Sequence, residues 1–442
     1  MTSSRGGEGS GPDIVLVTLD CVRADHWGMR GLTPGFDAVA QEGATFSQAF
    51  SQSQNTLSSH LSMLSSNYLF QHGVYSNHAT KPLPEHALPC RLAELGYRSQ
   101  AFTSIDFLAR ALGDQLGGED RRFATPGDES LRGRLVRRFR GRRATAAETL
   151  GRGARWLRGG PPGGRFLWLH LFDAHMVYQA PRRLLRQQVT EARAGSRCID
   201  EVRSRGWIHS AYPELEDEVP LSYFPERYAA AVSALDEALS RFVGSLKRMG
   251  LWDSVLLAVT ADHGECLEGD HGVYCEHRKL FDTTVHVPLW IRFPGGAHAG
   301  REVEALTQHV DLAPTIAAAV GFEEPLYMGH DLQAVLRGEQ EGHRFAYAEH
   351  VHGLQRAARD REWLLLEAVD GATAPEPLPP EPCRLFRRDA TPAPPDARAA
   401  GEELERLAKA LRASRPEVRQ AWGSAEEVDE TMRRRLAELG YL

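Results

Sequence analysis

The fold is decided by the stretch Val255-Leu256-Leu257-Ala258-Val259-Thr260-Ala261-Asp262-His263-Gly264-Glu265. Its first part is a short, continuous apolar run of the kind that predicts a buried strand in an α/β sheet. Asp262 and His263 would project together from the carboxyl end of that strand, which is the edge where open α/β sheets place ligands. A carboxylate beside an imidazole suits a divalent metal held by mixed oxygen and nitrogen donors.

A second strand of the same kind is predicted at Ile14-Val15-Leu16-Val17-Thr18-Leu19, and it ends on Asp20. Two strands far apart in the sequence would therefore deliver Asp20, Asp262 and His263 to one edge of the sheet. The alternative is that the two aspartates only cap the helices that follow their strands. For either aspartate alone the two interpretations have about equal weight, but the set of three favours a metal site.

In the rest of the first three quarters of the chain, segments with the apolar spacing of a strand alternate with segments that have the apolar spacing of a helix. This alternation predicts an α/β fold in which a large, mainly parallel or mixed sheet is sandwiched by helices. The expected strands are Ala44–Ala49, Tyr97–Thr103 and Phe166–Phe172, and the expected helices are Thr33–Gly43, Leu57–Leu64, Cys90–Leu95 and Tyr228–Met249.

From about Phe345 the pattern changes to short strands, a Pro-rich connection and terminal helices. The strands are expected at Phe345–Glu349, Leu354–Arg359 and Trp363–Glu367, the connection at Pro375–Pro395, and the helices at Glu402–Ser414 and Ala425–Leu439. We therefore predict a disordered tail at residues 1–12, a catalytic domain at 13–344, and a C-terminal subdomain at 345–442 that holds a small antiparallel sheet and the terminal helices.

Composition limits the classes of partner. The 442 residues include 52 basic and 59 acidic side chains, a formal charge of -7, which gives no electrostatic case for nucleic acid. One local basic run, Arg132 to Arg143, could contact an anionic surface or a polyanionic substrate, although a solvated surface helix is the favoured interpretation. No apolar segment is long enough to span a bilayer, and the N-terminal Met1 to Pro12 contains no apolar stretch of the signal-peptide kind. The six cysteines form no Cys-x-x-Cys pair. We expect a soluble, cytoplasmic protein with reduced thiols, and export by an unrecognised route is the alternative.

Asn55-Thr56-Leu57-Ser58-Ser59-His60 supplies a hydroxyl at the start of a predicted helix. Unpaired backbone N–H groups and the helix dipole favour an anion there. A threonine bound to a divalent cation could lose its proton and attack phosphorus or sulfur. From this segment alone, the simpler interpretation of Thr56 as an N-cap residue is favoured.

Over nearly its whole length the chain resembles the sulfatase family of the alkaline phosphatase superfamily. The resemblance is carried by Asp13 to Gly31 with Asp20 and Arg23; Thr33-Pro34-Gly35-Phe36-Asp37; Thr56 to His60 with His72-Gly73-Val74; Asp173-Ala174-His175; Thr260 to Glu265; Gly269-Asp270-His271-Gly272; Val287-Pro288-Leu289; His309 to Thr315; and Leu439-Gly440-Tyr441-Leu442.

This resemblance implies an alkaline-phosphatase-like fold and a divalent metal held by Asp20, Asp262 and His263, with the Thr56 hydroxyl as the fourth contact. It also implies that His175 and His277 bind the anionic oxygens of an ester or protonate its leaving group. His277 stands where the family often has lysine. Taken alone, each of these two histidines would be interpreted as an ordinary surface or hydrogen-bonded residue.

The chain departs from the family's pattern in two places. True sulfatases carry Cys-x-Pro-Ser-Arg, or serine in place of the cysteine, and oxidise that residue to formylglycine; Thr56 cannot give this aldehyde. The usual Asp-Asp pair is reduced to Asp20-Cys21, which removes one hard oxygen ligand. Cys21 is interpreted as a buried thiol packed beside the site, with soft ligation as the alternative. The donor set favours Mn²⁺ or Zn²⁺, with Ca²⁺ as the remaining option.

The leading hypothesis is a metal-dependent hydrolase or transferase that cleaves a phosphate or phosphonate ester through Thr56. A threonine nucleophile resembles the phosphodiesterases and phosphotransferases of the superfamily more than its arylsulfatases. The substrate would be a small-molecule or polymer-linked anionic ester. The alternatives are a sulfuric ester hydrolase that uses Thr56 directly and a catalytically inactive binding protein with the same fold.

Overall fold

The computed structural model describes residues 11–28, 31–77, 79–105, 108, 111–112, 144–176, 178–188, 223–267, 277, 279–353, 355–369, 383–387, 397–415, 417 and 426–427. Three features of the sequence lie outside these residues: the basic run Arg132–Arg143, the motif Gly269–Gly272 and the terminal Leu439–Leu442. The predicted tail at 1–12 also lies outside them, apart from Gly11 and Pro12.

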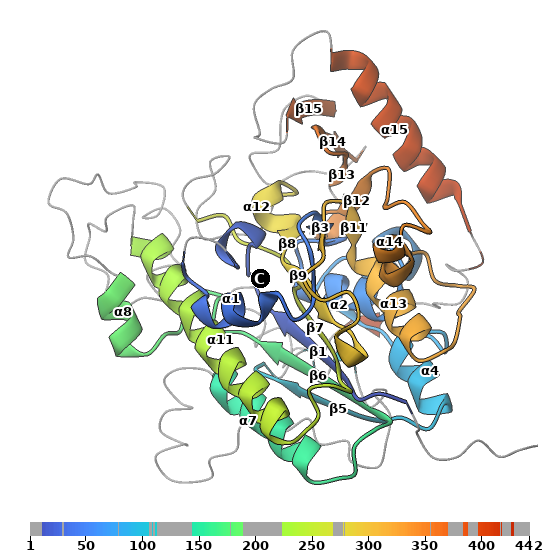
Figure 1. Cartoon of the computed structure of the whole chain (residues 1–442). Helices are drawn as coiled ribbons and strands as arrows, with labels where there is room; N and C mark the ends of the chain where they lie inside the picture. The colour runs from blue at the N-terminus through green and yellow to red at the C-terminus, as the bar shows by residue number, and fades with distance from the viewer. Residues whose placement is uncertain are drawn as a thin grey trace, which may run out of the picture.

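A seven-stranded sheet forms the centre of the molecule (Figure 1). β1 pairs in parallel with β6 and with β7, and β5 pairs in parallel with β6, while β9 runs antiparallel to both β7 and β2. The sheet is therefore mixed, with a parallel centre, as predicted. In order across the sheet, the strands are β10 (Glu302–Val303), β2 (Ala44–Phe46), β9 (Leu289–Arg292), β7 (Leu256–Ala261), β1 (Ile14–Leu19), β6 (Arg165–Leu171) and β5 (Arg98–Thr103).

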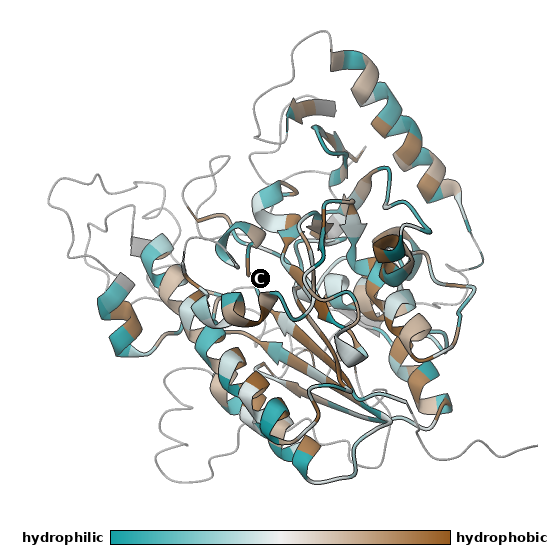
Figure 2. Ribbon diagram, in the orientation of Figure 1, coloured by the Kyte–Doolittle hydropathy of each residue, from teal (hydrophilic) through white to brown (hydrophobic). Residues whose placement is uncertain are grey.

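Helices cover both faces of this sheet, and Figure 1 shows α1, α7 and α11 on one side and α2, α4 and α13 on the other. Every residue of β1, β6 and β7 is buried, which explains why these strands are continuous apolar runs. Figure 2 shows brown along much of the central strands, with teal in parts of β6, and helices in which teal and brown alternate. The helices are α1 (Pro34–Ala40), α2 (Thr56–Ser65), α3 (Leu69–His72), α4 (Leu88–Glu94), α7 (Ala146–Arg158), α8 (Arg182–Gln188), α11 (Tyr223–Arg248), α12 (Asp282–Val285), α13 (Leu312–Ala319), α14 (Leu332–Arg337) and α15 (Arg398–Ala413).

The expected strand Ala44–Ala49 is divided between two sheets. β2 ends at Phe46 in the central sheet, and β3 (Ala49–Phe50) lies between β11 (Thr307–Gln308) and β8 (His286–Val287) in a three-stranded sheet. The prediction of one strand was wrong because the polar residues 47–48 form a turn that moves the chain from one sheet to the other.

The predicted small antiparallel sheet is confirmed in the C-terminal part of the chain. It has the order β12 (Ala346–Glu349), β13 (Gln355–Arg359), β14 (Trp363–Ala368) and β15 (Cys383–Arg387), and α15 packs against it. The sequence analysis missed β15, which lies inside the stretch predicted to be a Pro-rich connection. Glu426–Glu427 form β16, paired with β4 (Ala79–Thr80), and not the start of a helix; the rest of the predicted terminal helix lies outside the described residues. The domain boundary between 344 and 345 stays a prediction. Among the described helices, none is both long and apolar enough to cross a bilayer.

A buried ion pair holds the beginnings of β1 and β6 together. Arg165 Nε donates to Asp13 Oδ1 at 2.7 Å, and the same oxygen accepts the Gly163 N–H at 2.9 Å. The Arg165 and Asp13 side chains are only 1% and 2% exposed. Removal of one partner from such a pair leaves an uncompensated charge in the interior.

We expect Asp13→Ala to lower the free energy of unfolding by roughly 3–5 kcal/mol, because Arg165 would keep its buried charge without a partner. Urea denaturation followed by circular dichroism measures this. Arg183→Ala is the control, since it removes an ion pair with Glu237 in which the arginine is 55% exposed and solvent screens the charges, so the loss should be much smaller. Equal losses in the two variants would contradict the assignment.

Candidate functional site

The two predicted metal-site strands lie side by side at the centre of the sheet. β1 and β7 pair in parallel with Leu19 opposite Ala261, so Asp20 and Asp262 follow at the same level of the same edge. Both aspartate side chains are fully buried. The alternative that the two aspartates cap helices is wrong for the described residues. Asp262 Oδ1 accepts the N–H groups of Cys21 at 3.2 Å and His263 at 2.8 Å. After Asp20 the chain enters only a short 3-10 turn, and the N-cap residue of that turn is Arg23.

The structure brings the four predicted metal-site residues into one cluster. Thr56 Oγ1 lies 3.3 Å from His263 Nε2 and 3.5 Å from Asp20 Oδ2. His263 Nε2 lies 3.7 Å from Asp262 Oδ2 and 4.0 Å from Asp20 Oδ1. All four side chains are fully buried, so these separations bring oxygen and nitrogen donors together away from solvent.

Thr56 is the first residue of α2, and Asn55 is the N-cap residue, so the interpretation of Thr56 as the N-cap was wrong. All ten residues of α2 are buried, which fixes the helix between the sheet and α13. The Leu57 N–H donates to Asn77 Oδ1 at 2.9 Å. The Thr56 hydroxyl is therefore presented from the first turn of a rigid, buried helix.

His170 and His60 lie behind the cluster and were not predicted to have a role. His170 Nε2 donates to Asp20 Oδ2 at 3.1 Å, and its Nδ1 lies 3.0 Å from Thr18 Oγ1. His60 Nε2 lies 3.0 Å from the same hydroxyl, and its Nδ1 donates to the Thr56 carbonyl at 2.7 Å. Burial lowers the pKa of His170 to about 4 and that of His60 to about 3, so both rings are neutral near pH 7. They orient Asp20 and Thr56 without adding charge.

One signal in the sequence could have identified His170. It is the polar residue within the apolar strand Phe166-Leu167-Trp168-Leu169-His170-Leu171, and in the parallel pair it lies opposite Thr18. A polar side chain at a fully buried strand position needs a hydrogen-bond partner. That partner lies on a strand distant in sequence, so only the pairing of β1 with β6 reveals it.

His263 presents one nitrogen to the cluster. Its Nδ1 donates to the Gly264 carbonyl at 3.0 Å, so in this neutral tautomer Nε2 carries the lone pair that faces Asp20, Asp262 and Thr56. A hydrogen bond of this kind orients the histidines that bind metals in proteins.

The predicted His175 and His277 lie next to the cluster. The His277 ring centroid is 4.6 Å from that of His263 and 5.7 Å from that of His175. His175 stacks on Phe172 and its Nδ1 donates to the Met176 carbonyl at 2.6 Å. His277 Nδ1 is 3.5 Å from Oε1 of Glu265, a buried carboxylate to which the sequence analysis gave no role.

Asp173 has a structural role within its Asp-Ala-His motif. Its carboxylate accepts the Ala146 N–H at the start of α7, at 2.8 and 3.1 Å to the two oxygens. Burial raises the pKa of Asp173 to about 7. The aspartate thus ties α7 to the loop that carries His175.

The residues of the cluster fit a divalent cation. Asp262 Oδ2 is buried and has no hydrogen-bond partner among the described residues, although a buried carboxylate oxygen normally has one. Ligand atoms of Asp20, Asp262 and His170 lie within 4.8 Å of one another. A cation would neutralise the two carboxylates and complete the contacts of Asp262.

Comparison with known proteins gives short matches in sequence and long matches in structure. An N-acetylglucosamine-6-O-sulfatase from Bacteroides thetaiotaomicron is 34% identical over 113 residues, which are 25% of this chain and 20% of that protein. The multifunctional alkaline phosphatase superfamily protein PehA from Trinickia caryophylli is 32% identical over 133 residues, 29% of this chain and 25% of that protein. The chain thus matches about a quarter of the length of these curated relatives.

Among solved structures, the phosphonate monoester hydrolase of Agrobacterium radiobacter matches with a TM-score of 0.67 and 22% identity, over 91% of this chain and 95% of that one. A structure of BT4656 in complex with its substrate D-glucosamine-2-N,6-O-disulfate also has a TM-score of 0.67, with 16% identity, over 93% and 98% of the two chains. At these identities the structural matches establish the fold.

The family comparison covers most of the chain. The sulfatase family profile matches residues 12–322, which contain every residue of the cluster described above. Members of this family generally bind a divalent metal. The chain belongs to the sulfatase family.

Proposed function

We propose that this protein is a metal-dependent hydrolase or transferase that cleaves a phosphate or phosphonate ester, with Thr56 as the nucleophile. The observation that carries the proposal is the position of Thr56 Oγ1, at the first turn of a buried helix and within 3.3–3.5 Å of His263 Nε2 and Asp20 Oδ2. A hydroxyl among metal-type donors is the arrangement that activates an otherwise weak nucleophile.

Asp20, Asp262, His263 and the Thr56 hydroxyl would hold the cation, for which Mn²⁺ or Zn²⁺ is favoured by the mixed oxygen and nitrogen donors. When bound, the cation acidifies a neighbouring hydroxyl and neutralises charge on the ester. His170 and His60 keep Asp20 and Thr56 in place, and their neutral state leaves the positive charge of the site to the cation.

The chain's own groups account for the remaining steps. The Thr56 hydroxyl loses its proton to solvent, its Oγ1 attacks phosphorus in line, the ester P–O bond breaks, and the leaving alcohol takes a proton. His277 and His175, whose ring centroids lie 5.7 Å apart next to His263, would bind the non-bridging oxygens or supply that proton. The covalent phospho-threonine is then resolved by water, which gives hydrolysis, or by an acceptor alcohol, which gives transfer.

A sulfuric ester hydrolase is the second candidate, because the matched relatives include sulfatases. Thr56 would then attack sulfur directly, since threonine cannot be converted to formylglycine. The compact cluster of Asp20, Thr56, Asp262 and His263 argues against a binding protein without activity.

An assay panel of aryl sulfate, phosphate monoester, phosphate diester and phosphonate ester, each with Mn²⁺, Zn²⁺ or Ca²⁺, separates these functions. The proposed phosphate and phosphonate chemistry requires the highest kcat/KM on one of the three phosphorus esters.

Thr56→Ala should lower the rate by roughly three or more orders of magnitude, because the nucleophile and a metal contact are both removed. Thr56→Ser should keep part of the activity, since it retains the hydroxyl and loses only the methyl group that restricts its rotamer. Steady-state kinetics on the best ester measure both. Wild-type protein quenched during turnover should carry a phosphoryl adduct on the peptide that contains Thr56, and mass spectrometry detects it. The adduct accumulates if it is broken down no faster than it forms. Turnover by Thr56→Ala near the wild-type rate would show that water, and not Thr56, attacks the ester.

Asp262→Ala and His263→Ala should lose the bound metal and the activity while the protein stays folded, because both residues lie at the end of β7 and not within its paired part. Elemental analysis and circular dichroism measure metal content and folding. Asp25→Ala is a matched control, since Asp25 is also close to β1 but pairs with Arg23 outside the cluster. Full metal occupancy in the Asp262 and His263 variants would refute the ligand assignment.

His277→Ala should lower kcat with the metal retained, because His277 is proposed to contact the ester and not the catalytic cation. The measurement combines kinetics on every active ester with elemental analysis of the same preparation. Unchanged kinetics on all of these substrates would exclude His277 from the reaction.

A further inference from the structure

Arg359 is a buried charge at the junction between the C-terminal sheet and the rest of the chain. It is the last residue of β13, and only 1% of its surface is exposed. Phe50, Leu280 and Phe281 pack there in one apolar cluster with side chains of β12, β13 and β14. A buried charge pair is often no more stabilising than apolar residues of similar volume. Stability alone therefore does not account for an arginine at this position.

The guanidinium of Arg359 makes three contacts with chain segments outside its own sheet. Its Nη2 donates to the Leu280 carbonyl at 3.0 Å, and its Nη1 pairs with the Asp282 carboxylate. Its Cζ lies 4.8 Å from the centre of the Phe50 ring, a cation–π distance. Arginine can make such contacts together because its donors form a rigid, planar fork, which lysine lacks. The side chain therefore fixes the place of Leu280 and Asp282 relative to the C-terminal sheet.

The two residues whose polar groups Arg359 binds belong to the segment 280–285, which follows His277 in the chain. The end of this segment is anchored to the turn after β7, because the Gly264 N–H donates to the Thr284 carbonyl at 2.8 Å. Its beginning, three residues after His277, is where Arg359 binds. Of these two anchors, Arg359 is therefore the one nearer to His277 in the chain.

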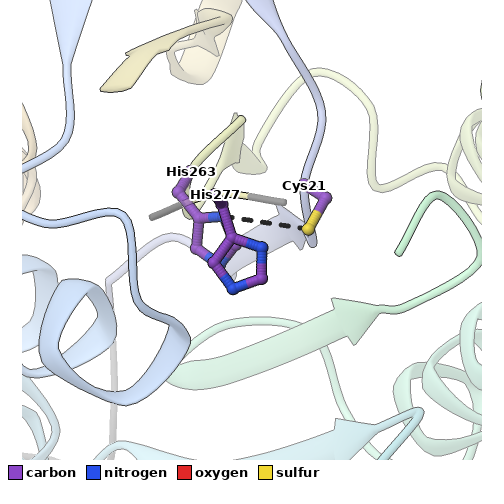
Figure 3. Close-up of side chains that lie close together, drawn as sticks. All are labelled: Cys21, His263 and His277. Atoms are coloured by element: carbon purple, nitrogen blue, oxygen red, sulfur yellow. Dashed lines mark hydrogen bonds between the residues drawn. The ribbon is translucent and has the colours of Figure 1, made fainter. Parts of the chain in front are cut away.

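The His277 ring lies beside that of His263, as Figure 3 shows, and the two ring centroids are 4.6 Å apart. A ring that binds an ester or protonates its leaving group has to be held to within about 0.5 Å of its working position. We propose that Arg359 is a positioning residue for His277, which it reaches through the 280–285 segment. The proposal rests on the proposed function, which assigns His277 to the ester. The C-terminal sheet, which supplies none of the candidate ligands, thereby takes part in the reaction.

Arg359→Lys tests this role, because it keeps a positive charge beside Asp282 and removes the guanidinium fork. The full chain with Zn²⁺ bound is labelled with ¹³C in its histidine rings, and the nuclear magnetic resonance signal of His277 is identified by its absence from His277→Ala. We expect this signal to shift or broaden in Arg359→Lys. The measurement needs no ester, so it remains valid if the ester chemistry proposed above is wrong.

On the ester with the highest kcat/KM, Arg359→Lys should lower kcat by roughly tenfold or more with the metal retained, since a displacement of about 1 Å can cost on the order of 100-fold. In a His277→Ala background the same substitution should have no further effect on kcat, because a residue that acts through His277 then has nothing left to position. A substitution that only weakened the fold would lower the rate in both backgrounds.

Arg412→Lys is the matched control. Arg412 lies on α15 and also reaches the C-terminal sheet, where its Nη1 is 3.4 Å from Tyr347 Oη and 3.7 Å from Glu367 Oε2, two residues outside the 280–285 segment. Its kcat and its His277 signal should match those of the wild type.

Asp282→Asn is a second variant, which removes the charge that Arg359 pairs with and should shift the His277 signal whatever the folding of Arg359→Lys. An unchanged His277 signal in Asp282→Asn and in folded Arg359→Lys would overturn the proposal. An equal loss of kcat in Arg359→Lys with and without His277 would also overturn it, because the arginine would then act on the rate by another route.

Discussion

The parallel pairing of β1 with β7 is the constraint on which the rest of the site depends. The two strands are buried along their whole length and aligned with Leu19 opposite Ala261, so their next residues are two aspartates at the same level. A shift of one residue in this register would exchange the faces on which the side chains of one strand pack and would move Asp20 and Asp262 to different levels of the edge. Asp262 Oδ1 then joins the two strand ends by accepting N–H groups from Cys21 and His263.

The elements that depend on local pattern could be predicted from the sequence. β1 was predicted with its observed bounds, and the helix at Leu57–Leu64 differs from α2 by one residue at each end, because continuous apolar runs and helical spacing are local signals. Asp20, Asp262 and His263 followed, since they stand at the ends of such strands, and Thr56 followed, since it stands at the start of the predicted helix. β15 was missed because Cys383–Arg387 is a short run with prolines before and after it. Its pairing with β14 depends on the tertiary structure and leaves no local signal in the sequence. The roles of His60 and His170 depend on partners far away in the sequence and could not be deduced from local pattern.

Burial also determines how charge is arranged around the site. Asp20 and Asp262 are carboxylates in the interior, where an ionised group is unfavourable unless it is compensated. The nearby His60, His170 and His309 have pKa values lowered by burial to between about 3 and about 4, so they supply hydrogen bonds and no positive charge near pH 7. Arg23 pairs with Asp25 at 2.8 Å. A bound divalent cation would therefore compensate two carboxylates that neutral histidines orient, which explains why polar residues gather here within an apolar sheet.

The three residues Asp262-His263-Gly264 act as one unit, and the glycine is needed for a steric reason. A Cβ atom at position 264 would lie 2.2 Å from the Thr283 carbonyl oxygen, so only glycine lets the chain pass there. This close passage brings the Gly264 N–H to the Thr284 carbonyl at 2.8 Å and its own carbonyl to His263 Nδ1 at 3.0 Å. That carbonyl accepts the single proton of the neutral ring and so turns the lone pair of Nε2 toward the carboxylates. The backbone of Gly264 thus selects the tautomer of His263, and through it presents the Nε2 lone pair to Asp20 and Asp262.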